Sequence, residues 1–187
     1  VTGVQKCALP ISDLVEVVIA GSTEAGFAGD DGPAADAKFS QLADLALGPD
    51  GSVYLADLGN CRVRRIRPDG VISTVAGNGE NGNTGDGGPA TAAAIQPQAL
   101  AIGANGEIYI ASGLFIRRVG PDGIITTMGG VGEQTETTTV PGAMPTQTYL
   151  GQSVALAVSP KNNLFIATRL NTISEIKSFL PGIGLGN

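Results

Sequence analysis

The chain alternates between short hydrophobic runs and clusters of glycine, proline and aspartate. In the first full set, four runs of apolar or alternating character lie at 44–47, 52–56, 62–67 and 71–76. Pro-Asp-Gly triplets at 49–51 and 68–70 separate the first run from the second and the third from the fourth. Proline presets φ, aspartate caps the turn and glycine accepts a positive φ. The pattern therefore predicts four short antiparallel strands joined by tight turns.

This set of runs recurs along the chain at spacings of about 53–56 residues. The motif Gly-Asp-Asp-Gly-Pro-Ala at 29–34 returns at 85–90 as Gly-Asp-Gly-Gly-Pro-Ala. The second set has runs at 99–102, 107–111, 115–119 and 124–128, and the third keeps two, at 154–158 and 164–167. Repeated units of four short strands predict an all-β fold, a β-propeller of four-stranded antiparallel blades, of which this chain holds about three.

Composition agrees with a fold rich in tight turns. The chain has 28 glycines and 11 prolines in 187 residues, without a Gly-X-Y period, and 42% of its residues are hydrophobic. It has no histidine, which excludes Ser-His-Asp triads, histidine-bound metals and histidine acid–base catalysis. Its two cysteines, Cys7 and Cys61, indicate no disulfide framework.

The net charge of the chain limits the kinds of partner that it can bind. The net charge of −6 and the pI near 4.5 argue against nucleic acid or anionic membranes as partners. No apolar run approaches the roughly 18–20 residues of a membrane span. Arginines nevertheless gather in the third runs of the first two repeats: Arg62, Arg64, Arg65, Arg67, Arg117 and Arg118. We interpret them as a solvated outer surface, because no aromatic residues accompany them as a stacking platform.

Two stretches resemble a known family. Residues 54–66, Tyr-Leu-Ala-Asp-x-Gly-Asn-x-Arg-Val-Arg-x-Ile, resemble an NHL repeat. The Ala-Gly-x-Gly and Gly-Asp-Gly-Gly-Pro-Ala motifs within 76–90 are similar to those of teneurin-type NHL propellers and their bacterial relatives. The resemblance covers roughly 15–179 and implies six blades. It also implies a non-enzymatic protein-interaction or ligand-binding scaffold of a larger exported bacterial protein, in the periplasm, outside the cell or at its surface.

The predicted organisation has three parts. Residues 1–12 match no repeat and resemble translated sequencing-adaptor sequence, so we exclude them from the fold. Residues 13–180 form a partial propeller, and 181–187 form a tail. Three blades are too few to close a ring. We therefore expect the remainder of a parent propeller to be one partner of this segment.

One face of the propeller is the predicted binding face. Loops after the second and fourth strands share a face, so the loop at 57–60 and the insertions at 22–40 and 78–96 are expected there. In the insertions, 33–39 and 89–95 are predicted to form one or two helical turns that pack between blades. The binding-face candidates are Asp30, Asp31, Asp57, Asn60 and Asp86. The expected ligand is a protein or a carbohydrate.

These candidates also have simpler roles. Clustered carboxylates suit Ca²⁺, but a calcium loop of the EF-hand type uses about five ligands in twelve residues and each insertion offers two or three. We therefore favour Asp30, Asp31 and Asp86 as caps of the helical turn or the loop, with no cofactor. Asp57 and Asn60 are interpreted as stabilising their loop through hydrogen bonds to neighbouring backbone.

Two other functions stay open. A fragment of a metal-dependent six-bladed hydrolase or lactonase would need acids and amides on its first strands, where Asp44 is the lone acid. The second open function is that of an extracellular sensor domain of a membrane kinase. Acids clustered at the channel mouth would favour the enzyme, whereas an apolar or aromatic patch on the insertion face would favour the binding module.

Overall fold

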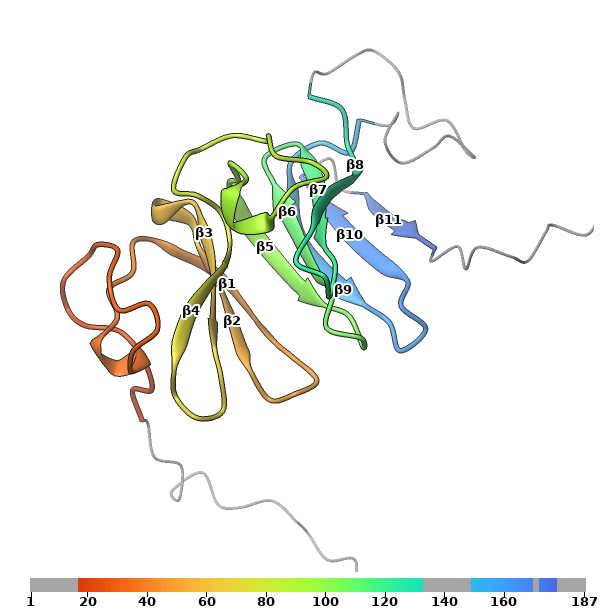
Figure 1. Cartoon of the computed structure of the whole chain (residues 1–187). Helices are drawn as coiled ribbons and strands as arrows, with labels where there is room; N and C mark the ends of the chain where they lie inside the picture. The colour runs from red at the N-terminus through yellow and green to blue at the C-terminus, as the bar shows by residue number, and fades with distance from the viewer. Residues whose placement is uncertain (1–16, 133–148, 170–171, 178–187) are drawn as a thin grey trace, which may run out of the picture.

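The chain folds into three small antiparallel sheets that stand side by side (Figure 1). The computed structural model describes residues 17–132, 149–169 and 172–177. The first sheet, blade 1, has the order β1-β2-β3-β4; blade 2 has β5-β6-β7-β8 and blade 3 has β11-β10-β9. The strands are β1 Leu42–Leu47, β2 Val53–Asp57, β3 Arg62–Ile66, β4 Ile72–Ala76, β5 Pro97–Ile102, β6 Ile108–Ser112, β7 Phe115–Val119, β8 Ile125–Gly129, β9 Ser153–Val158, β10 Leu164–Thr168 and β11 Ile173–Ile176.

The predicted all-β fold and every predicted strand are confirmed, with ends that differ by two residues or fewer. Blade 3 has one strand more than the sequence predicted. Strand β11 pairs antiparallel with β10, with Ile176 opposite Leu164 and Ile173 opposite Ala167. The segment Ile173–Ile176 alternates between apolar and polar side chains, but neither arginines nor a Pro-Asp-Gly turn mark it as a third strand.

The Pro-Asp-Gly turns have the predicted geometry. Gly51 and Gly70 take φ values of 81° and 82°, in the region that favours glycine. The Oδ1 atom of Asp69 accepts a hydrogen bond from the backbone N–H of Val71 at 3.1 Å, as an Asx cap does. The turns therefore fix the register of each hairpin.

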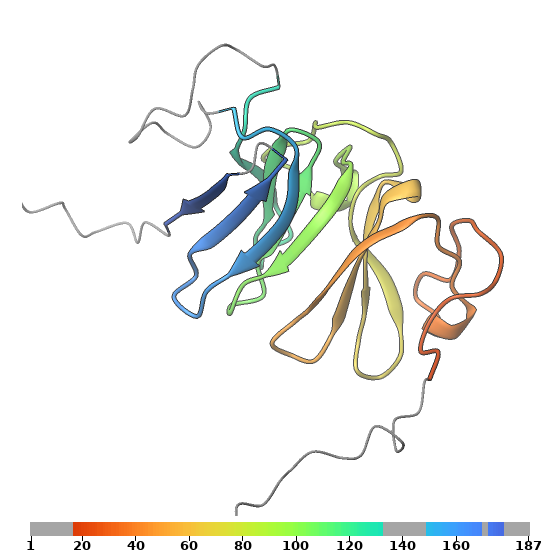
Figure 2. The same cartoon turned by 180° about the vertical axis from the view of Figure 1, so that it is seen from behind.

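First strands β1, β5 and β9 lie next to one another, and fourth strands β4 and β8 form the outer edges (Figure 2). A side chain also joins blades 1 and 2 at this inner position. Oδ2 of Asp44 accepts a hydrogen bond from the backbone N–H of Leu100 at 2.8 Å. This radial order of blades is the arrangement of a propeller.

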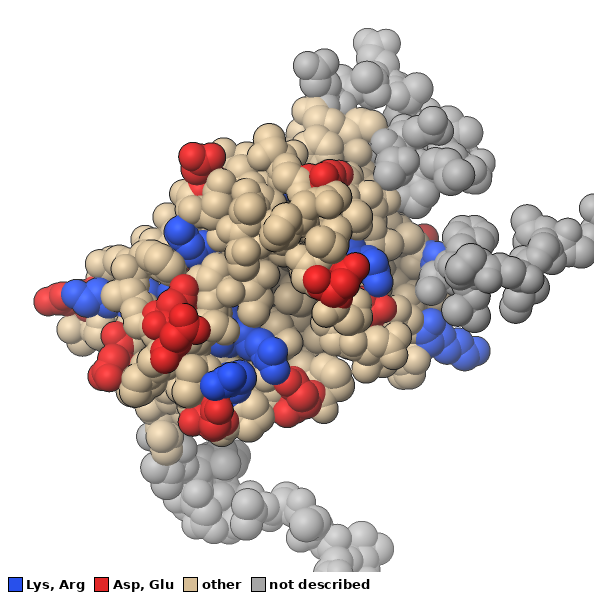
Figure 3. Space-filling model, in the orientation of Figure 1, with Lys and Arg blue, Asp and Glu red and all other residues tan. Residues whose placement is uncertain are grey.

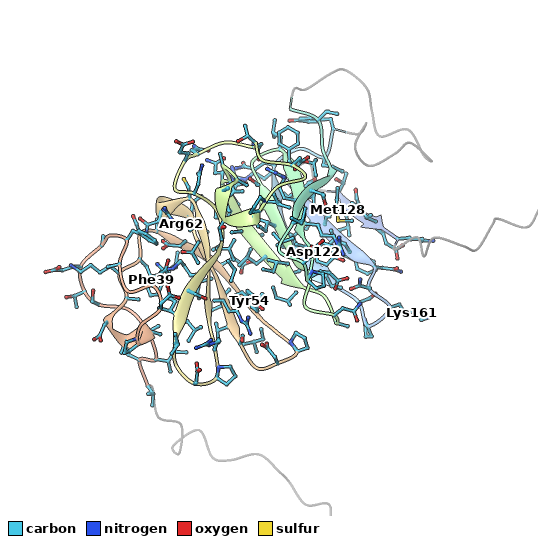
Figure 4. All side chains as sticks on the ribbon, viewed as in Figure 1. Phe39, Tyr54, Arg62, Asp122, Met128 and Lys161 are labelled. Atoms are coloured by element: carbon cyan, nitrogen blue, oxygen red, sulfur yellow. The ribbon has the colours of Figure 1, made fainter. Side chains whose placement is uncertain are left out.

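Two hydrophobic clusters fill the seams between blades. The first combines Tyr54 and Val63 of blade 1 with Leu100 and Ile110 of blade 2, and Figure 4 shows Tyr54 at this seam. The second joins blades 2 and 3 around Tyr109, with further residues Ala99, Ala101, Ala111, Ile116, Leu150, Leu164 and Ile166. Each blade is therefore stabilised by its neighbour.

Each insertion contributes a single short helical turn. The 3₁₀ turn η4 (Ala90–Ala92) and the residues after it place Ala90, Ala93 and Ile95 in the first seam cluster, where Ile95 is fully buried. This is the predicted packing between blades. The turn η2 (Ala34–Asp36) instead packs Ala34 beside Leu55, on the side of blade 1 away from blade 2.

The leader and tail, 1–12 and 181–187, lie outside the described residues, so their assignment stays a prediction. Within the ranges that the structure describes, no helix is long and apolar enough to cross a membrane.

Candidate functional site

Arg64, in the middle of β3, organises the predicted site of the first repeat. Its side chain is 0% exposed. Its Nε donates to Oδ1 of Asp30 at 3.0 Å, and its Nη2 donates to the carbonyl oxygen of Ala28 at 3.2 Å. Its guanidinium carbon lies 4.8 Å from the centre of the Phe27 ring. The solvated-surface interpretation is wrong for this arginine, because the 22–40 insertion covers it.

Asp57 completes this cluster from the end of β2 and is fully buried. Its Oδ1 accepts the backbone N–H of Ser40, and its Oδ2 accepts Nδ2 of Asn60, both at 2.8 Å. Asn60 also donates to the carbonyl oxygen of Gly26 at 2.7 Å. Burial raises the pKa of Asp57, against the opposing effect of these hydrogen bonds and of Arg64, whose Nη1 lies 3.6 Å away. The loop is therefore tied to the insertion at Ser40 and Gly26, a contact that the sequence interpretation did not include.

The second repeat repeats the arginine–aspartate pair. Arg117 on β7 is 0% exposed, and its Nη2 donates to Oδ1 of Asp86 at 2.6 Å and to the carbonyl oxygen of Thr84 at 3.1 Å. Oδ2 of Asp86 accepts the backbone N–H of Thr127 at 3.0 Å. Partial burial acts to raise the pKa of Asp86, but the Thr127 hydrogen bonds and the Arg117 charge outweigh it and hold that pKa below its ordinary value.

Ser112 stands in the second repeat where the first has Asp57. Its hydroxyl accepts the backbone N–H of Gln96 at 2.9 Å and lies 2.8 Å from the Asn83 amide. A hydroxyl carries no charge, and Arg117 keeps two buried groups, Nε and Nη1, without a hydrogen-bond partner. The two repeats therefore share the anchor but not its second carboxylate.

Of the two predicted capping roles, the one at the helical turn is wrong for Asp30 and Asp86. The turns η2 and η4 have Pro33 and Pro89 at their N-caps, and neither receives a side-chain cap. The carboxylates face the buried arginines instead, since an uncompensated buried charge is strongly destabilising.

Other arginines of the third strands and the turn after them pair with groups of their own blade or of the insertion that follows. Arg62 donates to the carbonyl oxygens of Asn60 and Asn78 at 3.0 and 2.8 Å. Arg65 pairs with Asp50 at 2.6 Å, and the half-exposed Arg67 pairs with Asp69 at 3.0 Å. Figure 3 shows basic and acidic groups interspersed on this face of the molecule, with no continuous basic patch.

Asp31 is exposed to solvent and, unlike the exposed Asp30 and Asp86, pairs with no arginine of the described residues. It adopts a left-handed φ of 62°, and its backbone N–H donates to the carbonyl oxygen of Ile72 at 2.8 Å. Pro33 pairs with Val71, beside the second Pro-Asp-Gly turn of blade 1. The middle of the insertion thus runs along the outer edge of the blade, away from Asp57. The prediction that the whole insertion shares one face is wrong, because its backbone pairs with β4.

The end of the molecule where the first strands begin has a hollow of about 280 Å³. We call this hollow the axial hollow; its lining residues are Ala43, Leu58, Gln98, Gln152, Ser153 and Arg169. Oε1 of Gln98 is buried without a hydrogen-bond partner. Arg169 forms no ion pair within the described ranges. None of these residues is among the five named candidates, although Leu58 lies in the predicted 57–60 loop. Gln98 and Ser153 lie at the starts of β5 and β9, and Arg169 follows the end of β10, where no sequence motif marks them.

The described residues contain no group of three Cys, Asp or Glu side chains able to hold a metal ion. Asp44, the acid that a hydrolase would use, directs Oδ1 to the backbone N–H of Leu45 and Oδ2 to that of Leu100, both at 2.8 Å. Both of its oxygens thus accept backbone hydrogen bonds, and the one from Leu100 joins blade 1 to blade 2.

Arg64 and Arg117 are the residues that sequence reasoning misjudged. A usable signal was present: an arginine recurs at one register of the third strand wherever an aspartate recurs in the preceding insertion. Paired recurrence of opposite charges predicts contact better than the local pattern of a strand does.

Solved structures share the fold. A putative phosphatase from Bacteroides thetaiotaomicron matches with a TM-score of 0.59 and 17% identity, over 77% of this chain and 36% of that one. An auxiliary nutrient binding protein from Bacteroides ovatus matches with a TM-score of 0.56 and 20% identity, over 76% and 39%. At these identities the likeness shows the fold alone.

Sequence relatives identify the family. Teneurin-3 of Danio rerio is 30% identical over 147 residues, which cover 67% of this chain and 5% of that protein. Teneurin-1 of Homo sapiens is 55% identical over 40 residues, 21% of this chain and 2% of that protein. The chain thus matches at most 5% of the length of these relatives. The teneurin NHL domain matches residues 20–67 and 69–178. The chain therefore belongs to the teneurin NHL domain family.

Proposed function

We propose that this chain is a non-enzymatic protein-binding module of a larger exported protein, and that its partner binds at the axial hollow. One observation carries the proposal: a hydrogen-bond acceptor and a positively charged group, both without a partner among the described residues, line this hollow. Gln98 presents a buried acceptor, Oε1, that no donor satisfies, and Arg169 presents an exposed guanidinium without a carboxylate from the described residues. Buried polar groups normally have hydrogen-bond partners.

An extended acidic peptide segment offers what both groups need. A backbone N–H can donate to Oε1 of Gln98, and an Asp or Glu carboxylate matches the forked donors of Arg169. Leu58 and Ala43 add apolar contact. A volume of about 280 Å³ is close to the lower end of ligand pockets, roughly 300 Å³, which suits a short segment of a partner protein.

The anchored insertions support a binding role because they hold the surrounding surface in one conformation. Asp57, on the strand that leads to the loop of Leu58, is fixed by Ser40, Asn60 and Arg64. A surface that is ordered before binding loses less conformational entropy when a partner docks. On this proposal the predicted binding-face acids hold the surface in place, and the ligand contacts fall to Gln98 and Arg169.

The test is binding of the chain to a panel of extended peptides that differ only in Asp against Asn and Glu against Gln. We expect acidic members to bind and the amide members to bind at least about tenfold more weakly, the effect of losing one charge-assisted hydrogen bond. Arg169→Gln should reduce binding of the acidic members by a similar factor. Fluorescence polarisation with labelled peptides measures both.

Arg67→Gln is the matched control, because Arg67 is also exposed but lies at the second turn of blade 1. It should leave peptide affinity unchanged. Equal effects of both substitutions, or binding of acidic oligosaccharides without any peptide, would contradict the proposal. No feature of the described residues favours the hydrolase alternative, since Asp44 is engaged between blades.

A further inference from the structure

We propose that the second repeat binds a small monovalent anion, such as chloride, between Arg117 and Ser112. The anion takes the place that one oxygen of the Asp57 carboxylate has in the first repeat. Its ligands are the Nε and Nη1 groups of Arg117 and the hydroxyl of Ser112, on side chains that are 0% exposed. We call this place the anion site.

The two repeats put the same groups at matching positions. Arg64 and Arg117 occupy the same register of their third strands, and Asp57 and Ser112 are the last residues of β2 and β6. Asp57 and Ser112 each accept a backbone N–H from the last residue of the preceding insertion, at 2.8 and 2.9 Å. Ser112 thus replaces one oxygen of Asp57. The other oxygen, which lies 3.6 Å from Nη1 of Arg64, has no counterpart in the second repeat.

The buried arginine of the second repeat also has the weaker counter-charge. Asp30 meets Arg64 at two nitrogens, Nε at 3.0 Å and Nη2 at 2.7 Å, whereas Asp86 meets Arg117 at Nη2 alone. The side chain of Asp86 is 50% exposed, against 29% for Asp30, so water screens its charge more. A buried charge is costly unless it is both paired and hydrogen-bonded. A bound monovalent anion gives the second repeat the charge balance of the first.

Three donors at the anion site lack an acceptor among the described residues. Two are the Nε and Nη1 groups of Arg117. The third is the hydroxyl of Ser112. The Asn83 amide donates through Nδ2 to Oγ of Ser112 at 2.8 Å, because the opposite orientation would set its oxygen against two carbonyl oxygens. The N–H of Gln96 donates to the same Oγ at 2.9 Å. This hydroxyl oxygen therefore accepts two hydrogen bonds, and its own hydrogen is left to donate.

A set of donors beside a positive charge selects an anion over water. A halide ion accepts from several N–H and O–H groups and donates nothing, whereas a water molecule brings two hydrogens that need acceptors of their own. Compared with aspartate, serine lacks one carboxylate oxygen and the carbon between the two oxygens. The difference in size suits a monatomic ion rather than phosphate or sulfate.

The anion would strengthen the hold of the second insertion on its blade. Asn83 and Asp86 belong to the insertion, whereas Ser112 ends β6 and Arg117 lies on β7. Its binding to the folded chain alone stabilises that state in proportion to anion concentration.

Unfolding in halide tests the site with the complete 187-residue chain. Urea denaturation is followed while chloride replaces gluconate at constant ionic strength, because screening of surface charges then stays the same. Gluconate is too large for the site. Once chloride exceeds its dissociation constant, the folded-to-unfolded ratio of the wild type should rise about tenfold for each tenfold increase in chloride.

Ser112→Asp places a carboxylate where the first repeat has Asp57, and it should remove the chloride dependence. Thr126→Asp, at an exposed position of β8, changes the net charge by the same amount and should keep the dependence. A wild-type chain that ignores chloride overturns the proposal, because water then satisfies the donors. An equal chloride dependence in the wild type and in Ser112→Asp also overturns it.

Asp86→Asn tests whether the anion lies beside Arg117. In this variant the anion is the remaining counter-charge of the guanidinium and is no longer repelled by a nearby carboxylate. Chloride should therefore bind more tightly than in the wild type, and the loss of stability should be largest in chloride-free buffer. An unchanged or weaker chloride affinity would place the ion elsewhere and overturn the proposal.

Bromide locates the ion independently of stability. In crystals grown with bromide, its anomalous scattering should give a peak at hydrogen-bond distance from the guanidinium of Arg117 and from Oγ of Ser112. Peaks at exposed arginines without one here would mean an adventitious ion only. That result would overturn the proposal even if the variants failed to fold.

Discussion

At the scale of single residues, two buried arginines determine the role of the aspartates in the two insertions. Arg64 and Arg117 are 0% exposed, and each meets an aspartate of the preceding insertion. Removing one partner of a buried ion pair leaves an uncompensated charge, which costs more than the intact pair contributes. Asp30 and Asp86 are therefore structural anchors, and substituting them should affect stability first.

Asp86→Asn should destabilise the chain by about 3 kcal/mol, because Arg117 then stays buried without a counter-charge. Urea denaturation measures this as a lower free energy of unfolding. Asp122→Asn is the control: Asp122 accepts a hydrogen bond from the backbone N–H of Ile124 at 3.1 Å and pairs with no arginine in the part of the chain that the structure describes. It should cost about 1 kcal/mol or less. Equal losses for the two variants would contradict the anchoring role of Asp86.

The effect of Asp86→Asn should also depend on pH. The folded-state pKa of Asp86 lies below its ordinary value of 3.8, so the ionised carboxylate contributes stability above that value. This contribution is lost as pH falls through the folded pKa. The difference in unfolding free energy between wild type and Asp86→Asn should be full at pH 7 and shrink below about pH 4. A difference that grows on acidification would contradict this sign.

The sequence located these residues but not their partners. The sequence interpretation gives Asp57 and Asn60 hydrogen bonds to neighbouring backbone, but their backbone partners in the structure are Ser40 and Gly26, 17 and 34 residues away along the chain. Arg64 lies 34 residues from Asp30, and local alternation reports only which side of a strand a side chain takes. Whether that side is covered depends on the path of the insertion, which strand periodicity does not encode.

At the scale of elements, the insertions behave as parts of their blades. Gly87 and Ala90 donate their N–H groups to the carbonyl oxygens of Ile125 and Gly123 at 2.8 and 2.9 Å, so the second insertion lines the edge of β8. An edge covered in this way is protected from pairing with other chains. Glycines at the start of each insertion allow the close approach that this path needs.

Gly77→Ala should cost much more stability than Gly87→Ala. Both glycines have positive φ, 91° and 78°, so both alanine variants carry the same kind of backbone strain, about 1–2 kcal/mol. A Cβ on Gly77 would in addition meet backbone atoms of Cys61 and Arg62, whereas one on Gly87 meets nothing within 4 Å. Thermal unfolding of the two variants measures the difference. Equal melting temperatures would contradict the tight approach at Gly77.

At the scale of the whole molecule, stability comes from the seams. The repeat spacing and turn chemistry predicted the blades because these signals are local. The sequence missed β11, since Ile173–Ile176 lacks the turn and the arginines of the other third strands, and its pairing with β10 is the feature that defines it. It also missed the axial hollow, because residues from different blades, such as Leu58, Gln98 and Arg169, meet only after the blades pack.

Ile95→Ala should destabilise blades 1 and 2 together. Ile95 is fully buried in the cluster that both blades share, so the cavity should cost about 2–5 kcal/mol. Amide signals of β2 and β6 should disappear at the same urea concentration, lower than in the wild type. Ile173→Ala, at a side chain 79% exposed, is the control and should leave that urea concentration close to its wild-type value. Loss of one blade before the other would contradict a shared seam.

Native-state hydrogen exchange of Asp86→Asn tests the anchoring of the insertions most directly. The N–H groups of Gly87 and Ala90 report on the insertion, and that of Ile110 reports on β6. If Arg117 and Asp86 hold the insertion to its blade, the variant should exchange Gly87 and Ala90 at least about tenfold faster through local opening, with a smaller change at Ile110. Equal changes at all three positions, or none at Gly87 and Ala90, would show that the insertion is held by other contacts.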